Sequence, residues 1–201
     1  MLADCHNKDV IEAGVDEAGR GCLAGPVVAA AVILHPGAVM DWYELLDDSK
    51  KLPESLRDKL RQLIERDALA WSVAMVDARE IDRINILNAT YQAMHKAVSA
   101  LCTAPEALLI DGNRFLPIPG IPHTCIVKGD ATYMSIAAAS ILAKTHRDAL
   151  MKSLHREYPQ YGWDRNKAYG TAGHVRAIRQ FGYSPYHRRS FQLKELQLSL
   201  F

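Results

Sequence analysis

Acidic side chains stand at the ends of three apolar stretches of this sequence. Asp16 and Glu17 close the stretch VIEAGVDE, Asp111 closes LLID, and Asp130 follows the glycine of IVKGD. Ligands of α/β sheets bind at the carboxyl ends of strands, and carboxylate oxygens hold Mg²⁺ together with water and substrate phosphates. Two ions roughly 3.5–4 Å apart would support in-line attack of water on a phosphodiester. The four acids therefore predict metal-dependent phosphodiester hydrolysis, although each Asp taken singly is also typical of a turn cap.

The adjacency of Asp16 and Glu17 imposes a geometric condition. Neighbouring residues of a regular strand point to opposite faces of the sheet. The two acids can therefore share one site only if the strand ends or bulges there, or if one of them contributes its backbone carbonyl. For this motif alone, a solvated acidic pair at a turn is an equally good explanation, so the prediction depends on the other two acids.

Gly19, Gly21 and Ala24 formally match the dinucleotide fingerprint G-x-G-x-x-A. That fingerprint must open a helix whose N-terminus faces a pyrophosphate, yet Pro26 leads here into the strand-like VVAAAVIL. The preceding acids would also place negative charge beside the phosphates. We therefore disfavour an oxidoreductase and expect the glycines to let a sugar-phosphate chain approach main-chain N–H groups.

Basic and aromatic side chains gather in three loops. The stretches DDSKKL, NKAYGT and HRRSF contribute Lys50, Lys51, Tyr169, Arg188 and Arg189. Lysine and arginine contact phosphates, and a tyrosine among them can stack on a sugar or a base. Each group alone is more often a solvated face, so the prediction of a substrate-binding surface depends on the three together.

Four further residues have more than one explanation. Lys144 and Arg147 lie three apart on a predicted helix, and an ion pair with Asp148 or Glu157 explains them as well as phosphate contacts do. His174 and His187 could assist proton transfer, but isolated histidines usually pack or form hydrogen bonds.

The elements that must position these residues alternate between strands and helices, which predicts an α/β layered domain around a mixed sheet. Strands are expected over residues 10–16, 26–34, 70–77, 107–112 and 123–130, the first two as a hairpin. Helices are expected over residues 53–69, over 78–102 with a break near Asn85, and over about 133–157. We expect residues 1–157 to form the catalytic core and 158–201 a small helical substrate-binding segment with a tail.

Composition narrows the class of protein. The 201 residues suit one main domain, and 24 basic against 23 acidic residues mean that a nucleic-acid surface must come from local clustering. Four scattered cysteines without a CxxC pair argue against a zinc ribbon or a disulfide framework. Without a signal core or an apolar run of roughly 20 residues, we expect a soluble, cytoplasmic protein with no membrane partner. Nothing in the sequence requires more than a monomer.

From about residue 10 to about residue 192, the chain resembles bacterial ribonuclease HII. The motifs that carry the resemblance occur in the family's order and spacing: GVDEAGRGCLAGPVVAAAVIL, DDSKKL, INILNAT, LLIDGN, VKGD, SIAAASILAKTHRD, YPQYGW and HRRSF. The resemblance implies a ribonuclease H-like core with a five-stranded mixed sheet flanked by helices, and a small C-terminal helical segment.

The resemblance also implies an activity. Ribonuclease HII cuts the RNA strand of RNA–DNA hybrids and the 5′ side of a ribonucleotide embedded in duplex DNA, with Mg²⁺ or Mn²⁺, leaving 3′-hydroxyl and 5′-phosphate ends. By motif, the acids Asp16, Glu17, Asp111 and Asp130 would bind two ions. Gly19, Arg20 and Gly21 would read the 2′-hydroxyl and grip the phosphate, while Tyr169 would contact the same ribonucleotide and stack on the next deoxyribose. The 2′-hydroxyl is what distinguishes RNA from DNA.

Two alternatives stay open beside this one. A catalytically silent binding protein could keep the fold and the basic loops, although all four acids are present. Ribonuclease HIII usually carries an extra N-terminal domain, and roughly ten residues precede the first motif here, which disfavours it. One departure from ribonuclease HII is Ala168, where the family usually has glycine. If that position needs a positive φ, Ala168 would shift the loop and weaken recognition of the junction.

The last five residues form the apolar stretch QLSLF. Gln197, Leu198, Leu200 and Phe201 resemble the peptide that bacterial DNA-processing enzymes insert into the sliding clamp. Packing of the two leucines and the phenylalanine onto their own domain explains the stretch equally well.

Overall fold

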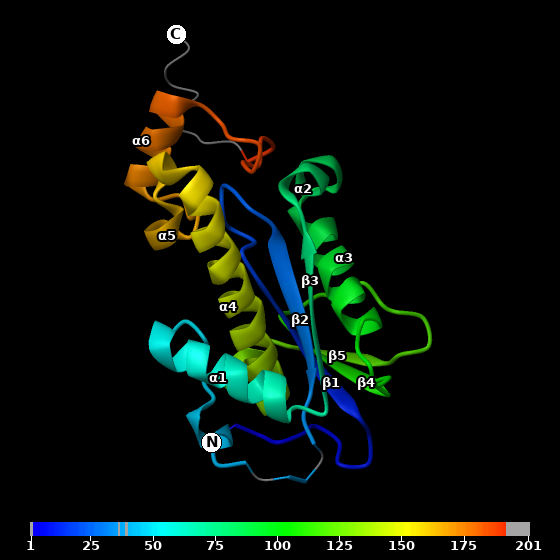
Figure 1. Cartoon of the computed structure of the whole chain (residues 1–201). Coiled ribbons are helices and arrows are strands. Elements are labelled where there is room, and N and C mark those ends of the chain that lie inside the picture. The colour runs from blue at the N-terminus through cyan, green and yellow to red at the C-terminus, as the bar shows by residue number, and fades with distance from the viewer. Residues whose placement is uncertain (1, 36, 39, 192–201) are drawn as a thin grey trace.

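A five-stranded mixed sheet forms the centre of the protein (Figure 1). The computed structural model describes residues 2–35, 37, 38 and 40–191. The strands lie in the order β3-β2-β1-β4-β5, with β2 antiparallel to both neighbours and β4 parallel to β1 and β5. Their bounds are β1 (Glu12–Ala18), β2 (Val27–Ile33), β3 (Ala70–Val76), β4 (Ala107–Asp111) and β5 (His123–Ile126). The expected fold class and the hairpin of the first two strands are confirmed.

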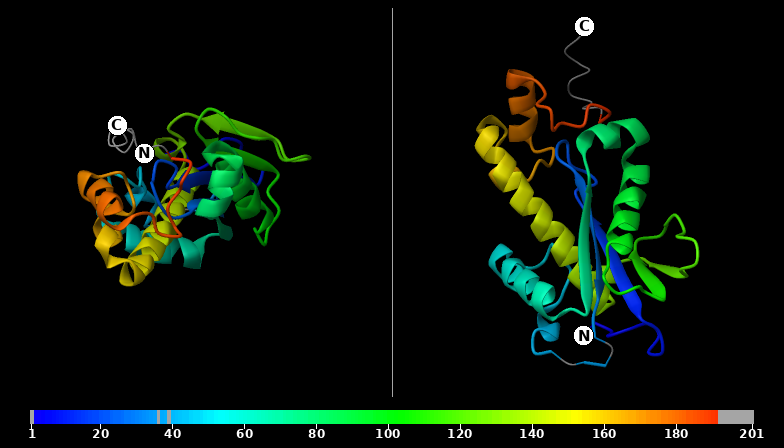
Figure 2. Two further views of the ribbon diagram at one scale, coloured as in Figure 1. Left: turned by 90° about the horizontal axis from the view of Figure 1, so that it is seen from above. Right: turned by 45° about the vertical axis from the view of Figure 1, so that its right-hand side comes forward.

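Helices cover both faces of the sheet, as Figures 1 and 2 show. On one face lie α1 (Glu54–Asp67) and α4 (Met134–Glu157), and on the other α2 (Ala78–Ile84) and α3 (Ile86–Ser99). Every residue of β2 is buried, which explains its unbroken apolar sequence, because a strand covered on both faces has no polar side. At Gly14, a Cβ atom would lie 2.2 Å from the Ser135 carbonyl carbon, so glycine lets α4 pack directly on β1.

Asn85 separates α2 from α3, as the sequence predicts. Its φ angle is 67°, in the left-handed region, and its side-chain Oδ1 accepts a hydrogen bond from the Asn88 N–H at 3.1 Å. The left-handed residue ends one helix, and its side chain caps the next.

Two strand boundaries differ from the predictions. β1 continues to Ala18, so Asp16 and Glu17 lie within the strand and not at its end. β5 stops at Ile126, because Lys128 has a φ of 58° and turns the chain into the 3-10 helix Gly129–Ala131. Asp130 therefore sits on a turn before α4, and its expected place on a strand end was wrong.

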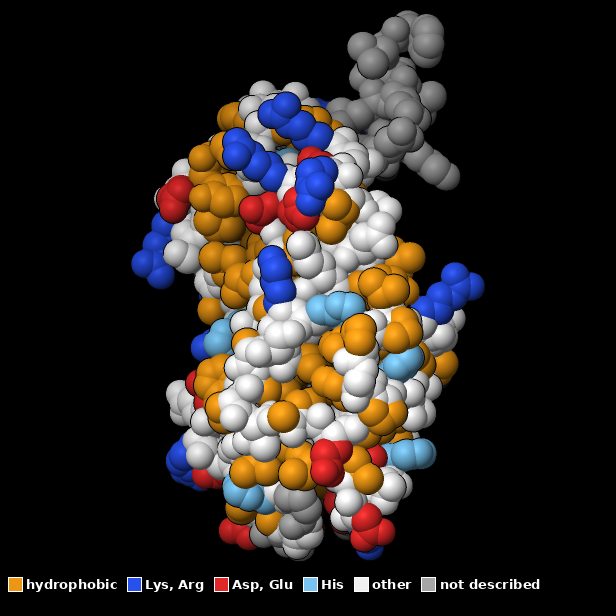
Figure 3. Space-filling model, turned by 90° about the vertical axis from the view of Figure 1, so that its right-hand side faces the viewer, with side chains coloured by type: hydrophobic (Ala, Val, Ile, Leu, Met, Phe, Trp, Pro, Cys, Tyr) orange, Lys and Arg blue, Asp and Glu red, His pale blue; other side chains and the backbone are white. Residues whose placement is uncertain are grey.

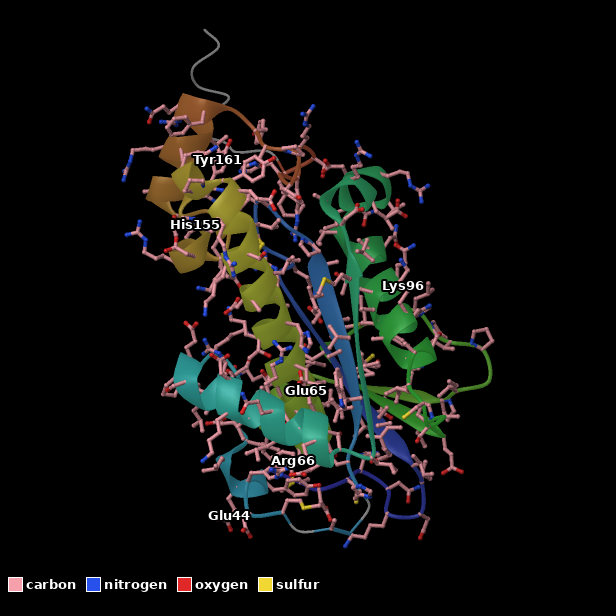
Figure 4. The ribbon with its side chains drawn as sticks, viewed as in Figure 1. Glu44, Glu65, Arg66, Lys96, His155 and Tyr161 are labelled. Atoms are coloured by element: carbon pink, nitrogen blue, oxygen red, sulfur yellow. The ribbon has the colours of Figure 1, made fainter. Side chains whose placement is uncertain are left out.

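The C-terminal segment contains a 3-10 helix at Pro159–Tyr161, α5 (Trp163–Asn166) and α6 (Ala172–Phe181). It packs on the far end of α4, where Tyr161 is labelled in Figure 4. Its apolar cluster also takes in Cys22 and Ala24 from the β1–β2 turn. The helical nature of this segment is confirmed, whereas the division at residue 157 stays a prediction. Among the described residues, no helix is both long and apolar enough to cross a bilayer.

A buried histidine makes this segment sensitive to acid. His187 is 2% exposed, and burial together with the neighbouring His174 lowers its pKa to about 4. In the unfolded chain, His187 has the ordinary pKa of 6.5. Between pH 4 and pH 6.5 the unfolded state therefore binds more protons at His187 than the folded state does. His187 therefore contributes stability that is present above pH 6.5 and lost as the pH falls toward 4.

We expect the free energy of unfolding to fall by roughly 3 kcal/mol from this group over that pH range. Urea unfolding at several pH values between 7 and 4 measures it. Because other groups also titrate, the comparison is with His187→Gln, whose stability should depend less steeply on pH. Parallel curves for the two proteins would contradict the assignment.

Candidate active site

Asp16 and Asp111 lie on the same face of the sheet. In the parallel pair β1 and β4, Val15 is opposite Ile110, and both of these side chains belong to the core on the α3 side. Since neighbouring strand residues alternate between faces, Asp16 and Asp111 point to the other face, toward α4. The Oδ1 atom of Asp111 accepts a hydrogen bond from the Gly129 N–H at 2.7 Å, which ties the strand to the turn before α4.

Strand alternation along β1 starts Glu17 on the opposite face of the sheet from Asp16, although the charges of Asp111 and Lys50 still act on the pKa of its carboxyl. β1 keeps a regular register here, with Glu17 opposite Ala29, so the strand neither ends nor bulges between the two acids. Glu17 Oε1 pairs instead with Arg20 Nη1 at 3.2 Å. The backbone carbonyl offers one route by which Glu17 can share a site with Asp16, and the role of Glu17 as a metal ligand stays a prediction.

Asp130 joins the cluster from the turn before α4 and is 6% exposed. Burial raises the pKa of its carboxyl, and the charges of Asp111 and Asp48 raise it further, while Lys50 acts in the opposite direction. Asp48 is an acid near the cluster that the sequence did not single out. It sits in the same DDSKKL loop as Lys50, so its nearness to Asp130 depends on how that loop folds back.

Burial raises the pKa of Asp16 well above its ordinary value, and the charges of Glu17 and Asp111 add to this effect. Burial also raises the pKa of Glu17, against the attraction of Arg20. Carboxylates gathered out of water repel one another, and such groupings are typical of functional sites. A bound cation would remove this repulsion.

The donor set fits a hard divalent cation, although the acids do not already surround one. No group of three or more His, Cys, Asp and Glu residues within the described ranges is arranged to hold a metal ion. Mg²⁺ usually keeps several waters and binds through one or two carboxylates plus substrate phosphates. Oxygen ligands from Asp16, Asp111 and Asp130 suit that chemistry, because water and substrate complete the coordination.

Lys50 faces the acids, whereas Lys51 does not. Burial alone would lower the pKa of Lys50, but Asp48, Asp130, Asp16 and Asp111 raise it overall. The Lys51 Nζ atom pairs with Asp47 Oδ1 at 3.0 Å, and both side chains are exposed. The loop itself is held to α4 by a hydrogen bond of 2.9 Å between the hydroxyls of Ser49 and Ser140.

The Gly19-Arg20-Gly21 turn is shaped by Arg147 of α4. Gly19 has a φ of 91°, and a Cβ atom there would lie 2.0 Å from the Arg147 Nε atom. At Gly21, a Cβ atom would meet nothing within 4 Å among the described residues. Protein packing therefore explains the first glycine but not the second. The Arg20 side chain is 52% exposed beside Glu17.

Arg147 and Arg188 are buried and hold main-chain carbonyls. Arg147 donates hydrogen bonds of 2.9–3.1 Å to the carbonyls of Pro26, Lys167 and Ala24. Arg188, fully buried, donates to the Gly25 carbonyl at 3.0 Å and the Arg20 carbonyl at 2.9 Å. Arg188 therefore turns its guanidinium toward main-chain carbonyls inside the protein, and its role in substrate binding stays a prediction.

Arg189 is exposed, while its backbone N–H donates to Asp82 of α2 at 2.9 Å. With Arg79, Tyr183 and other residues it lines a groove of about 480 Å³. Several Lys and Arg side chains lie at this end of the molecule, with Asp and Glu side chains among them (Figure 3). Arg189 thus remains available for phosphate contact.

The Tyr169 loop has an unusual backbone. Lys167 and Ala168 have φ angles of 47° and 66°, so the position usually occupied by glycine does need a positive φ. The loop nevertheless docks on the glycine turn, because the Leu23 N–H donates to the Ala168 carbonyl at 2.8 Å. Tyr169 is 42% exposed, and the Lys144 Nζ atom lies 6.0 Å from its ring centroid.

Sequence reasoning left the role of α4 unresolved. The alternative of an ion pair with Asp148 or Glu157 is confirmed for Lys144, which pairs with Asp148, four residues on, at 2.7 Å. Arg147 points to the other side and binds carbonyls, a role for which the sequence carries no signal. The dinucleotide-binding alternative was wrong, because strand β2 and not a helix follows the glycines.

The sheet order and the carboxylates that converge beside α4 define a ribonuclease H-like nuclease. A family model described as "Ribonuclease HII" matches residues 13–194, and the chain belongs to that family. Ribonuclease HII proteins are metal-dependent endoribonucleases of the type 2 ribonuclease H class, so this chain is an enzyme of that class.

Individual relatives agree with this assignment. The ribonuclease HII of Phocaeicola vulgatus is 59% identical over 194 residues, covering 96% of this chain and 94% of the relative. The ribonuclease HII in a complex with PCNA from Archaeoglobus fulgidus has a TM-score of 0.74 at 25% identity, covering 92% of this chain and 96% of that one. Bst-RNase HIII in complex with Mn²⁺ shares the fold at a TM-score of 0.67 and 22% identity, and the match covers 90% of this chain and 67% of that one.

The two glycines of the turn should respond differently to a methyl group. Gly19→Ala introduces both a left-handed alanine and a clash with Arg147, so we expect the free energy of unfolding to fall by roughly 2–4 kcal/mol. Gly21→Ala, which meets open space, should change it by less than about 0.5 kcal/mol. Urea unfolding of both variants measures this, and equal losses would contradict the role given to Arg147.

Proposed function

We propose that the enzyme cuts the 5′ side of single ribonucleotides embedded in duplex DNA as well as the RNA strand of hybrids, leaving 3′-hydroxyl and 5′-phosphate ends. Its cellular roles would be ribonucleotide excision repair and RNA primer removal. The observation that carries the proposal is the Gly21 position, four residues after Glu17, where a Cβ atom would meet nothing within 4 Å among the described residues. A backbone that no side chain shields can approach a 2′-hydroxyl closely.

Asp16, Asp111 and Asp130, with the backbone of Glu17, would hold Mg²⁺ or Mn²⁺, with two ions when substrate is bound. Such ions supply a nucleophilic water and steady the leaving oxygen in phosphodiester hydrolysis. Lys50 faces the same acids, so its charge limits their mutual repulsion and would attract a substrate phosphate to the site. Bst-RNase HIII, a protein with this fold, binds Mn²⁺.

Substrate reading is assigned to two loops. Gly19, Arg20 and Gly21 would contact the ribonucleotide and its phosphate. The Arg20 side chain is exposed, and Arg188 holds the Arg20 carbonyl by a hydrogen bond. Tyr169 would stack on the following deoxyribose, because its ring is part exposed and its loop is hydrogen-bonded to the glycine turn. Lys51 and Arg189 would add phosphate contacts farther along the duplex.

The direct test uses an end-labelled DNA duplex that carries one ribonucleotide, with an all-DNA duplex beside it. We expect a single cut on the 5′ side of the ribonucleotide with Mg²⁺ or Mn²⁺, and none with EDTA. Asp130→Asn should lower kcat by roughly 100-fold or more, the size typical of losing a catalytic electrostatic contact. Asp58→Asn, an exposed acid on α1, serves as the control and should leave the rate unchanged.

Two outcomes would change the proposal. Absence of cutting in any metal, with duplex binding intact, would support the silent binding protein. Cutting of long hybrids alone would point to the Tyr169 loop, where Ala168 replaces the usual glycine.

We also propose that Gln197, Leu198, Leu200 and Phe201 bind the bacterial sliding clamp. These residues lie outside the described part of the chain, so the support is the peptide sequence and the PCNA complex of the Archaeoglobus fulgidus relative. Deletion of residues 197–201 should abolish binding to the clamp in a pull-down and leave cleavage of a short duplex unchanged. A truncated protein that still binds the clamp would overturn this proposal.

A further inference from the structure

Two buried histidines form a hydrogen-bonded pair behind the Tyr169 loop. His174 of α6 is 0% exposed and His187 of the C-terminal segment is 2% exposed. Their Nε2 atoms lie 3.1 Å apart. His174 Nδ1 lies 3.0 Å from the Tyr169 carbonyl oxygen, so the pair ends on the main chain of the residue assigned to the ribonucleotide junction.

The partners of the two rings determine where their protons are. The Tyr169 carbonyl can only accept, so the proton of His174 is on Nδ1. His187 Nδ1 accepts from the Ser184 N–H at 2.9 Å, so the proton of His187 is on Nε2. His187 Nε2 therefore donates to His174 Nε2, which also accepts from Trp163 Nε1 at 3.0 Å. Both rings are neutral, and each has one fixed tautomer.

The surroundings keep the rings neutral. The Tyr161, Trp163 and Tyr183 rings contact His187 with centroids 4.7, 5.5 and 5.4 Å away. His187 lines the same groove as the charged residues Arg79, Asp82 and Arg189. A further charged residue, Arg188, follows His187 directly in the chain. Burial lowers the pKa of both histidines. A proton added to either ring would place two N–H groups face to face.

The loop that the pair supports needs external support. Lys167 and Ala168 are both left-handed, a conformation that costs non-glycine residues energy and persists only where the surroundings impose it. Three successive carbonyls are held by three parts of the molecule. Arg147 of α4 donates to the Lys167 carbonyl, and the N–H of Leu23 in the β1–β2 turn donates to the Ala168 carbonyl. His174 Nδ1 donates to the Tyr169 carbonyl.

We propose that His174 and His187 are positioning residues that set the place of Tyr169 and thereby the preference for ribonucleotide–DNA junctions. This inference rests on the role proposed above for Tyr169. The same C-terminal segment also holds the glycine turn, because the Gly25 N–H donates to the Tyr186 carbonyl at 2.9 Å and Arg188 holds the Arg20 carbonyl. The pair therefore links both substrate-reading loops to one support.

The test compares variants by the ratio of kcat/KM on a single-ribonucleotide duplex to kcat/KM on a long hybrid. His174→Leu removes the donor to Tyr169 and should lower this ratio roughly tenfold, the effect of losing one buried hydrogen bond. His174→Asn keeps an N–H near the Nδ1 position and should stay within about threefold of the parent protein. His155→Leu, a histidine of the same region that approaches Asp164, is the matched control and should leave the ratio unchanged.

Tyr169→Ala separates the two ideas. If it lowers the ratio and His174→Leu does not, the positioning role is overturned while the role of Tyr169 stands. If Tyr169→Ala leaves the ratio unchanged but His174→Leu lowers it, the role proposed for Tyr169 fails and the loop acts through other atoms. Unfolding reduces both rates in parallel, so a lowered ratio cannot come from unfolding, and an unchanged ratio overturns the positioning role only in a variant whose circular dichroism shows it folded.

A second measurement needs no variant. Nitrogen-15 NMR of the histidine rings in the full chain should show a neutral Nδ1–H tautomer for His174 and a neutral Nε2–H tautomer for His187 between pH 8 and pH 6. A charged imidazolium at either position in this range, or the opposite tautomer at His174, would overturn the inference.

Discussion

The buried guanidinium of Arg147 is the interaction on which the rest of the site depends. It donates hydrogen bonds to the carbonyls of Ala24 and Pro26, in the turn between β1 and β2, and to the carbonyl of Lys167 in the Tyr169 loop. Burial of this charge is offset because all three guanidinium nitrogens of Arg147 are hydrogen-bonded. The arrangement therefore forces the glycine turn to pass close to α4, where Gly19 has no room for a side chain.

Arg147 thus holds together the two loops proposed to bind the substrate, while the acids beside α4 repel one another. The acids beside α4 are buried together, and burial and mutual charge raise the pKa of Asp16 and Asp130. The fold stabilises that unfavourable cluster through the packing of β1, β4 and α4. A site held in this state gains most from cations and from the phosphates that come with them, which suits an enzyme whose substrate is a nucleic acid.

Much of the fold was predictable because its signals are local. The apolar runs of β2 and β4, the amphipathic α1 and the break at Asn85 follow from periodicity and turn chemistry. The ends of β1 and β5 were not predictable, because pairing with β2 carries β1 to Ala18 and a left-handed Lys128 stops β5 early. Both errors concern the acids proposed to bind metal, because the face that each acid occupies depends on where its strand ends.

The sequence by itself determined the chemistry of this protein: four carboxylates, a glycine turn and basic loops in the order of the ribonuclease HII family. Residue types carry donor atoms, charge and backbone freedom, and these do not depend on the fold. Only the tertiary structure decided which charges face the substrate. Arg188 turned inward, Lys50 faced the acids, and His174 and His187 became a neutral pair, because burial and partners, which come from distant parts of the chain, decide how a charge or a proton is used.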